Sequence, residues 1–204
     1  IDRAYCPFPE IEDSERSLRR MGLGTIGLAD ALIVAGLKYG SDEAIEFTHR
    51  VFRTIKDAAY SASIKLAAER GSFPFFDAER YGQGSFILDL PSELQLAIQQ
   101  KGIRNAFLTS QAPTGTIAKL AGVSEGIEPY FDRQTILKNR LGTHVVDAPD
   151  SPYLVTANEV TPRQHIGMMV AAQAHIDSAV SKTVNAPEDQ LVEETDKVYR
   201  LAYG

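Results

Sequence analysis

The feature that most constrains this chain is a segment in its middle, where an alternating run of residues meets a proline and then a glycine. Residues 105–111 alternate apolar and polar side chains, as a strand does. Pro113 has no N–H and ends the strand, and Thr114 or Thr116 can cap a helix that follows. Gly115 lets the backbone turn where a Cβ would clash. The segment therefore predicts a strand that passes through a tight turn into a helix N-terminus.

A turn of this kind is suited to binding an anion. Its N–H groups can point together at one spot, beside the positive end of the helix dipole, and many proteins hold phosphate in this way. The threonine hydroxyls add donors, and the small side chains leave room for phosphate oxygens. No lysine or arginine lies inside the turn, so backbone groups are expected to do most of the binding. We therefore predict a phosphate site formed by Pro113, Thr114, Gly115, Thr116 and Ile117.

Composition narrows the class of protein. The 204 residues, 44% apolar and 24% charged, are typical of one globular domain or a large piece of one. The net charge of −6 argues against nucleic acid or an anionic membrane as the main partner. The single cysteine, Cys6, excludes an internal disulfide and suits a reducing compartment. No apolar run reaches the roughly 20 residues that span a bilayer. We expect a cytoplasmic protein without a membrane or nucleic-acid partner.

Helical and extended patterns alternate along the chain. Ser41, Asp42 and Glu43 form a cap and an acidic first turn, and apolar residues then recur at helical spacing until Gly71. Helices are expected at 28–37, 41–71, 91–101, 116–121, 161–180 and 188–203, strands at 105–111, 133–140 and 181–185, and a loop at 142–153. This alternation predicts an α/β arrangement of layers.

Two motifs point to other functions, but their surroundings do not support them. Gly22, Gly24 and Gly27 match the dinucleotide fingerprint, yet a charged segment precedes them where the fingerprint needs an apolar strand. We interpret these glycines as allowing close packing. Ser124 stands in a G-x-S-x-G motif, with Asp150 and His165 following in the order of a hydrolase triad. Pro129 lies where the helix after a nucleophile should continue, so we interpret Ser124 as a turn residue.

Other polar residues give weaker indications. His165 and His175 are ten residues apart in one predicted helix, too far to share a metal ion, so we predict no metal site. We also predict no catalytic residue in this chain. Glu128 precedes Pro129 and is therefore expected in extended geometry. Its carboxylate could point into a pocket, lie at the surface, or orient a neighbouring backbone amide.

The central segment also resembles a known family. APTGTI followed by GVSEGIEPYF resembles the substrate-phosphate loop of ribonucleotide reductases, in a form more like the adenosylcobalamin-dependent class II enzymes than class I. Segments 19–30, 39–44 and 175–185 agree with the family in order and spacing. The resemblance implies the helix-rich C-terminal portion of a ten-stranded α/β barrel. It also implies an oxidoreductase that makes deoxyribonucleotides for DNA replication by thiyl-radical chemistry, with adenosylcobalamin as cofactor and ribonucleoside di- or triphosphates as substrates.

Parts of the family pattern are missing. The family carries its radical on a cysteine in an N-x-C-x-E arrangement and draws electrons from a cysteine pair, and Cys6 matches neither. By the resemblance, the radical-cysteine loop would precede Ile1. We therefore expect residues 1–204 to be a fragment of a single catalytic-barrel domain that lacks the upstream half and is inactive alone. Its partner would be that N-terminal segment or a complementary chain, with a homodimer as a further option.

Two departures and two alternatives qualify the resemblance. Ala118 stands where a serine is more usual, and Glu125 occupies a position that is often serine or asparagine in relatives. The first alternative is a fragment of a class I large subunit, which uses a separate radical-generating partner. The second is a non-catalytic module that binds nucleotides or phosphate and assembles with another chain.

Overall fold

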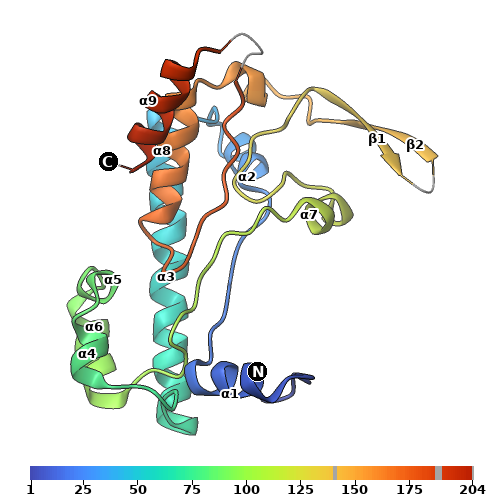
Figure 1. The fold of residues 1–204 in the computed structure, drawn as a ribbon. Helices are drawn as coiled ribbons and strands as arrows, with labels where there is room; N and C mark the ends of the chain where they lie inside the picture. The colour runs from blue at the N-terminus through green and yellow to red at the C-terminus, as the bar shows by residue number, and fades with distance from the viewer. Residues whose placement is uncertain (140–141, 187–189, 204) are drawn as a thin grey trace. The chain divides into compact units, whose positions relative to one another are not determined.

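The computed structural model describes residues 1–139, 142–186 and 190–203 and divides into two compact units (Figure 1). Unit 1 comprises Ile1–Leu23, Val51–Ser110 and His175–Ala179. Unit 2 comprises Gly24–Arg50, Gln111–Ala174 and Val180–Gly204. Both units are therefore assembled from segments that lie far apart in the sequence.

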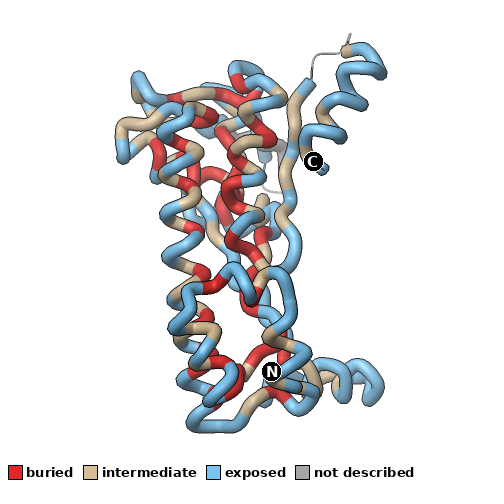
Figure 2. The backbone as a smooth tube through the Cα atoms, turned by 90° about the vertical axis from the view of Figure 1, so that its left-hand side faces the viewer, coloured by how far each residue is buried: buried red, intermediate tan, exposed pale blue. Residues whose placement is uncertain are grey.

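Unit 1 is mainly helical. It contains α1 (Pro9–Leu18), most of the long helix α3 (Asp42–Arg70), and three shorter helices: α4 (Ala78–Gly82), α5 (Ser85–Leu88) and α6 (Ser92–Lys101). Buried residues recur along α3 (Figure 2). The core of the unit consists of side chains from α3, α5, α6 and the segments around them: Tyr60, Ile64, Phe73, Ile87, Leu90, Ile98, Ile103, Ala106 and Leu108. The predicted long helix is thus confirmed.

The Asp177 carboxylate holds the extended backbone of residues 108–109 in unit 1. Asp177 accepts hydrogen bonds from the N–H groups of Leu108 (2.7 Å) and Thr109 (2.9 Å) and from the Tyr60 hydroxyl (2.9 Å). Leu23 forms a parallel bridge with Thr109. Buried N–H groups need acceptors, and here a side chain supplies them where a neighbouring strand would normally do so. Asp177 therefore fixes the residues that lead toward the predicted phosphate turn.

Unit 2 contains α2 (Leu28–Val34), α7 (Gly115–Ala121), the strands β1 (Gln134–Asn139) and β2 (Gly142–Asp147), the short helix η1 (Ala157–Glu159), α8 (Pro162–Gln173) and α9 (Val192–Tyr203). Helix α8 begins with a capping box between Thr161 and Gln164, as the Thr-Pro pattern predicts. Helix α9 packs beside α8 (Figure 1).

The structure corrects some of the predicted elements. The loop expected at 142–153 contains β2, which pairs antiparallel with β1 from Gln134↔Asp147 to Asn139↔Gly142. The strand expected at 105–111 is reduced to the isolated parallel bridges Leu23↔Thr109 and Gln111↔Val180, and the residues expected as a strand at 181–185 form none. Helices and a two-stranded sheet both occur among the described residues, and this agrees with the α/β class in its coarse form. The described residues contain no helix that is long and apolar enough to cross a membrane.

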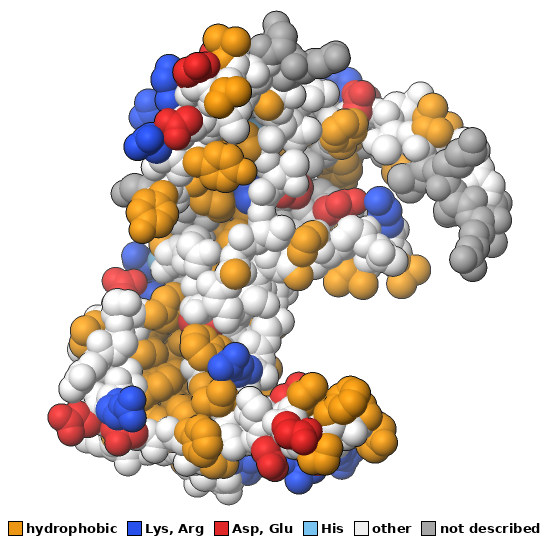
Figure 3. Space-filling model, viewed as in Figure 1, with side chains coloured by type: hydrophobic (Ala, Val, Ile, Leu, Met, Phe, Trp, Pro, Cys, Tyr) orange, Lys and Arg blue, Asp and Glu red, His pale blue; other side chains and the backbone are white. Residues whose placement is uncertain are grey.

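Apolar side chains are exposed around α1. Phe8 and Ile11 are 59% and 49% exposed, and α1 contributes no buried residue. Orange and red side chains lie together over this helix in Figure 3, so its surface mixes apolar and acidic groups. The helix therefore adds little to the core of unit 1.

Candidate functional site

The predicted phosphate turn lies at the start of α7. Thr114 adopts the left-handed conformation (φ 60°, ψ 20°), which is unusual for a β-branched residue. Its hydroxyl donates to the Pro113 carbonyl (2.7 Å) and makes no cap hydrogen bond, so the predicted threonine cap is wrong at this residue. The first N–H groups of a helix, here those of residues 115–117, have no acceptor within the helix. Pro113, Thr116 and Ile117 are exposed, so these donors lie in an accessible turn.

The role of Gly115 differs from the one the sequence predicts. The left-handed residue of the turn is Thr114, and the structure gives Gly115 no positive φ. A Cβ on Gly115 would lie 3.3 Å from a carboxylate oxygen of Glu125. The glycine therefore permits the close approach of Glu125 instead of an unusual backbone turn.

A buried glutamine fixes the entry to the turn. Gln111 is 1% exposed and accepts hydrogen bonds from the backbone N–H (3.0 Å) and hydroxyl (2.9 Å) of Thr25. Its amide nitrogen donates to the carbonyls of Thr25 (2.8 Å) and Ala112 (3.1 Å). The N–H of Ser181 donates to the backbone carbonyl of Gln111 (2.9 Å). These bonds hold the backbone immediately before Pro113.

The segment after α7 is held by the start of α2. Asp30 accepts hydrogen bonds from the Ser124 N–H (2.7 Å) and the Tyr130 hydroxyl (2.6 Å), and burial together with this bond raises the pKa of Tyr130. The N–H groups of Gly27 and Leu28 donate to the carbonyls of residues 124 and 126. These two amides, at the end of the glycine motif, therefore bind protein carbonyls and are not available to a pyrophosphate.

The turn packs against Gly126. This glycine has φ 48°, and a Cβ on it would lie 3.0 Å from the Gln111 side-chain nitrogen and 3.1 Å from the Ala112 carbonyl oxygen. Side chains larger than hydrogen at this position would press against the backbone at the entry to the turn. The position of residue 126 therefore helps to set the shape of the turn.

A half-exposed ion pair lies beside the turn. Glu125, whose carboxylate approaches Gly115, pairs with Lys119 of α7 at 3.1 Å. The acid places negative charge close to donors that suit an anion, and Lys119 offsets part of it.

Lys182, Glu128 and His165 form a buried cluster beside the segment that follows α7. The Lys182 ammonium, with 1% of its side chain exposed, pairs with Glu128 and contacts His165 Nδ1 (2.9 Å). Burial lowers the pKa of Lys182, and Glu128 acts in the opposite direction. Burial, reinforced by the charge of Lys182, lowers the pKa of His165 to about 4. His165 Nε2 also contacts the Ala157 carbonyl (3.3 Å). Both ring nitrogens thus have partners other than Ser124, which does not fit a hydrolase triad.

Two of the three options for Glu128 hold, because it lines a cavity and also binds a backbone amide. Its second oxygen accepts a hydrogen bond from the Thr183 N–H (2.7 Å), so it does orient a backbone amide. Its ion pair with Lys182 was not predicted, because 54 residues separate the two in the sequence. The lone carboxylate before Pro129 was the only indication that a buried cation would be needed.

A cavity of about 490 Å³ adjoins α7. Residues that line it include Lys119, Ser124, Glu128, Tyr130 and Asn185. The hydroxyl of Ser124 is buried and has no hydrogen-bond partner among the described residues.

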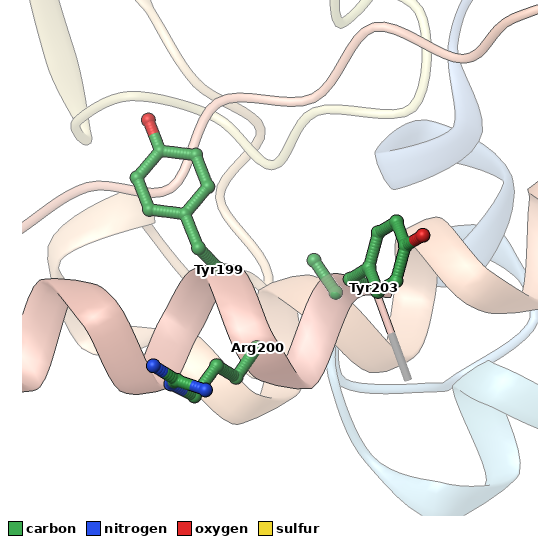
Figure 4. Close-up of a pocket in the computed structure, with 4 residues that line it drawn as sticks. Tyr199, Arg200 and Tyr203 are labelled. Carbon is green, nitrogen blue, oxygen red and sulfur yellow. The ribbon is translucent and has the colours of Figure 1, made fainter.

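A second hollow lies on α9 and is lined by only four residues of that one helix. Tyr199 and Tyr203 project from one side of the helix and Arg200 from another (Figure 4). Arg200 pairs with Asp196 (2.7 Å), so its charge is already matched. No group of three or more His, Cys, Asp or Glu side chains in the described ranges could hold a metal ion. The turn before α7 remains the best candidate site.

Comparison with known proteins identifies the family of the chain. All of residues 1–204 match the model of the ribonucleotide reductase barrel domain. A vitamin B12-dependent ribonucleoside-diphosphate reductase of Mycobacterium tuberculosis (strain CDC 1551 / Oshkosh) is 34% identical, over all of this chain and 32% of that protein. One from Thermoplasma acidophilum is 30% identical, over 99% of this chain and 29% of that protein.

A viral relative is similar at a lower coverage. The ribonucleoside-diphosphate reductase large subunit of Monkeypox virus is 30% identical, over 93% of this chain and 25% of that protein. The chain thus spans about a third or less of the length of these curated relatives. Since the family model covers the full chain, the chain belongs to the ribonucleotide reductase family, within the barrel domain.

Proposed function

We propose that this chain is the part of a ribonucleotide reductase catalytic barrel that holds the substrate phosphates. The observation that carries the proposal is the accessible turn formed by Pro113, Thr114, Gly115, Thr116 and Ile117, which presents helix N–H groups without acceptors inside the helix. The turn would bind and orient the di- or triphosphate of a ribonucleotide. In this proposal the parallel segments 21–23, 107–111 and 180–181 are strands of a ten-stranded barrel.

The radical chemistry would come from outside this chain. The Cys6 thiol donates to the Phe8 carbonyl (3.3 Å), and Cys6 is the single cysteine of the sequence. We propose that residues 1–204 form a fragment of one catalytic domain in a cytoplasmic enzyme. The N–x–C–x–E loop and the reducing cysteine pair would then belong to an upstream segment or a complementary chain, with a homodimer as a further assembly.

We propose adenosylcobalamin as the cofactor of the complete enzyme, because the relatives from Mycobacterium tuberculosis and Thermoplasma acidophilum are named as vitamin B12-dependent. When bound, it would supply the initiating radical. The cavity of about 490 Å³ lies in the size range of pockets for drug-sized ligands, far smaller than a corrinoid with its nucleotide tail. This cavity alone therefore does not form a complete cofactor site, and we assign none of the described residues to the cofactor.

Substitution of Gly115 by valine tests the phosphate site. The new side chain would press on Glu125 and narrow the turn, so we expect affinity for CDP and CTP to fall at least tenfold. In wild type, NMR shifts of backbone amides during the titration should centre on residues 114–117. Gly82→Val is the matched control, because the nearest atom to a Cβ there is 3.9 Å away. A folded wild-type chain whose turn amides do not respond would contradict the site.

Substitution of Glu125 by glutamine is expected to strengthen phosphate binding two- to fivefold. Unit charges about 4 Å apart in water interact by about 1 kcal/mol, and the Glu125 carboxylate approaches the turn that would hold the anion. Isothermal titration with pyrophosphate at low salt measures the change. Glu194→Gln on α9 removes the same charge from an exposed site and should leave the affinity unchanged. Equal affinities for Glu125→Gln and wild type would show that the carboxylate does not act on the site.

The enzyme assignment is tested with a protein that carries this chain together with the radical-cysteine segment. We expect it to reduce ribonucleotides only when adenosylcobalamin is added. Reduction that needs a radical-generating protein partner instead would favour a class I subunit. Polyphosphate binding without turnover under either condition would favour a non-catalytic binding module.

A further inference from the structure

The buried cluster around Lys182 satisfies every donor of a charged ammonium. Its nitrogen contacts one oxygen of Glu128, His165 Nδ1 (2.9 Å) and the Thr183 carbonyl (2.7 Å). It also lies 5.8 Å from the centre of the Tyr39 ring. An ammonium has three N–H donors, so three acceptors use all of them. Such a group is fixed in position and has no free donor for a ligand.

The same cluster fixes a turn formed by residues 125–128. Glu128 accepts the Thr183 N–H (2.7 Å) with its second oxygen, and its own N–H donates to the Glu125 carbonyl (2.8 Å). The Tyr39 hydroxyl donates to the Ile127 carbonyl (2.6 Å). Residues 125–128 are therefore held from the side of Lys182 and Tyr39.

Residues 125–128 pack against the backbone that leads into the proposed phosphate turn. Gly126 lies within it, and a Cβ on Gly126 would meet the Gln111 side chain at 3.0 Å and the carbonyl oxygens of Ala112 and Pro113 at 3.1 and 3.4 Å. On the other side, the Ser181 N–H binds the Gln111 carbonyl, one residue before Lys182. Lys182 thus joins the two segments that flank the residues leading into the phosphate turn.

We propose that Lys182 is a positioning residue for the phosphate turn: by tying residues 125–128 to residues 181–183, it holds the Pro113–Ile117 backbone in the shape that binds phosphate. This inference rests on the proposed function of the turn. Lys182 does not contact the phosphate itself, because its donors are already used within the cluster. Its effect passes through Glu128 and Gly126.

Stability and positioning can be separated experimentally. Replacing both members of a buried ion pair by uncharged residues of similar size often leaves stability unchanged. The three contacts of the ammonium, however, have no equivalent in a thioether side chain. A double variant Lys182→Met/Glu128→Gln should therefore fold, yet allow residues 125–128 to shift relative to 181–183.

The test compares this double variant with wild type in two measurements on the chain. Titration with pyrophosphate gives the affinity. Hydrogen exchange of the Ala118 and Ser181 amides, which donate to the Thr114 and Gln111 carbonyls (2.9 Å each), reports on the turn without any ligand. We expect at least tenfold weaker pyrophosphate binding and faster exchange at these amides. The matched control Lys197→Met/Glu194→Gln neutralises an acid and a base at exposed positions of α9 and should change neither.

A second variant covers the case in which the double variant does not fold. Lys182→Arg keeps the positive charge beside Glu128, but a planar guanidinium does not reproduce the three contacts of an ammonium. We expect at least threefold weaker pyrophosphate binding from it, with faster exchange at the turn.

The outcomes distinguish this inference from the proposed function. If wild type binds pyrophosphate and the folded variants bind it equally well, the positioning role of Lys182 is overturned and the phosphate site stands. If wild type does not bind but the turn exchanges faster in the variants, the phosphate assignment fails while the positioning contact is supported. Absence of both effects overturns both.

Discussion

Replacing Glu128 by methionine is expected to lower the free energy of unfolding by about 3–5 kcal/mol, the usual cost of leaving a buried charge without its partner. Lys182 has 1% of its side chain exposed and pairs with this carboxylate, so the ammonium would lose its counter-charge inside the protein. Thr183 would also lose the acceptor of its N–H group. Urea denaturation of both proteins at pH 7 measures the difference.

A second substitution separates the lost pair from the lost packing. Adding Lys182→Met to Glu128→Met removes the unpaired charge, so most of the stability should return. Glu125→Met is the matched control, since its carboxylate is 41% exposed and pairs with a half-exposed lysine. Exposed pairs contribute about 0–1 kcal/mol, so this control should cost little. A loss below about 1 kcal/mol for Glu128→Met would mean that Lys182 finds another partner or reaches water.

Local patterns in the sequence predicted the elements whose causes are local. The helix beginning at Asp42 has a Ser-Asp-Glu start and a glycine after its last residue, and the structure places it at Asp42–Arg70. Helix α8 begins at Pro162 because Thr161 and Gln164 form a capping box within four residues. The turn before α7 was predicted from Pro113 and its neighbours for the same reason.

Features that depend on distant partners could not be predicted in this way. The left-handed residue is Thr114 instead of the glycine after it, and no local rule favours that choice for a β-branched side chain. Asp177 holds the backbone of residues 108–109, and no local pattern around it indicates that role. The strand expected at 105–111 forms only two isolated bridges, at Thr109 and Gln111, and the Asp177 carboxylate accepts backbone hydrogen bonds that a neighbouring strand would accept in a sheet.

The candidate site follows from this use of buried polar side chains. Gln111, Asp30 and Glu128 each bind backbone groups from a segment far away in the sequence. Buried polar groups that are fully hydrogen-bonded rigidify a structure and specify one arrangement. The turn proposed to bind phosphate lies between the segments that these three side chains hold, and this explains how a helix of seven residues can present a defined surface.

Lowering the pH from 7 to 5 is expected to reduce the stability of wild type by about 2 kcal/mol through His165 alone. Burial and the charge of Lys182 lower the pKa of this ring from near 6.5 to about 4. Between these two values the unfolded chain binds a proton that the folded chain does not. Acid therefore favours unfolding, and this contribution is complete only below pH 4.

Substitution of His165 by glutamine tests this origin of the acid sensitivity. A glutamine side chain can donate to the Ala157 carbonyl and accept from Lys182, the two contacts that the ring makes, without gaining a proton in this range. The free energy of unfolding, measured by urea denaturation from pH 7 to pH 4, should therefore fall less steeply in the variant. The difference between the two losses should be about 2 kcal/mol at pH 5. If the free energies of unfolding of the two proteins fall in parallel with pH, His165 takes up its proton at the same pH in the folded and the unfolded chain. In that case the cluster around Lys182 would have to open to water, and the ammonium would no longer be held at three fixed acceptors.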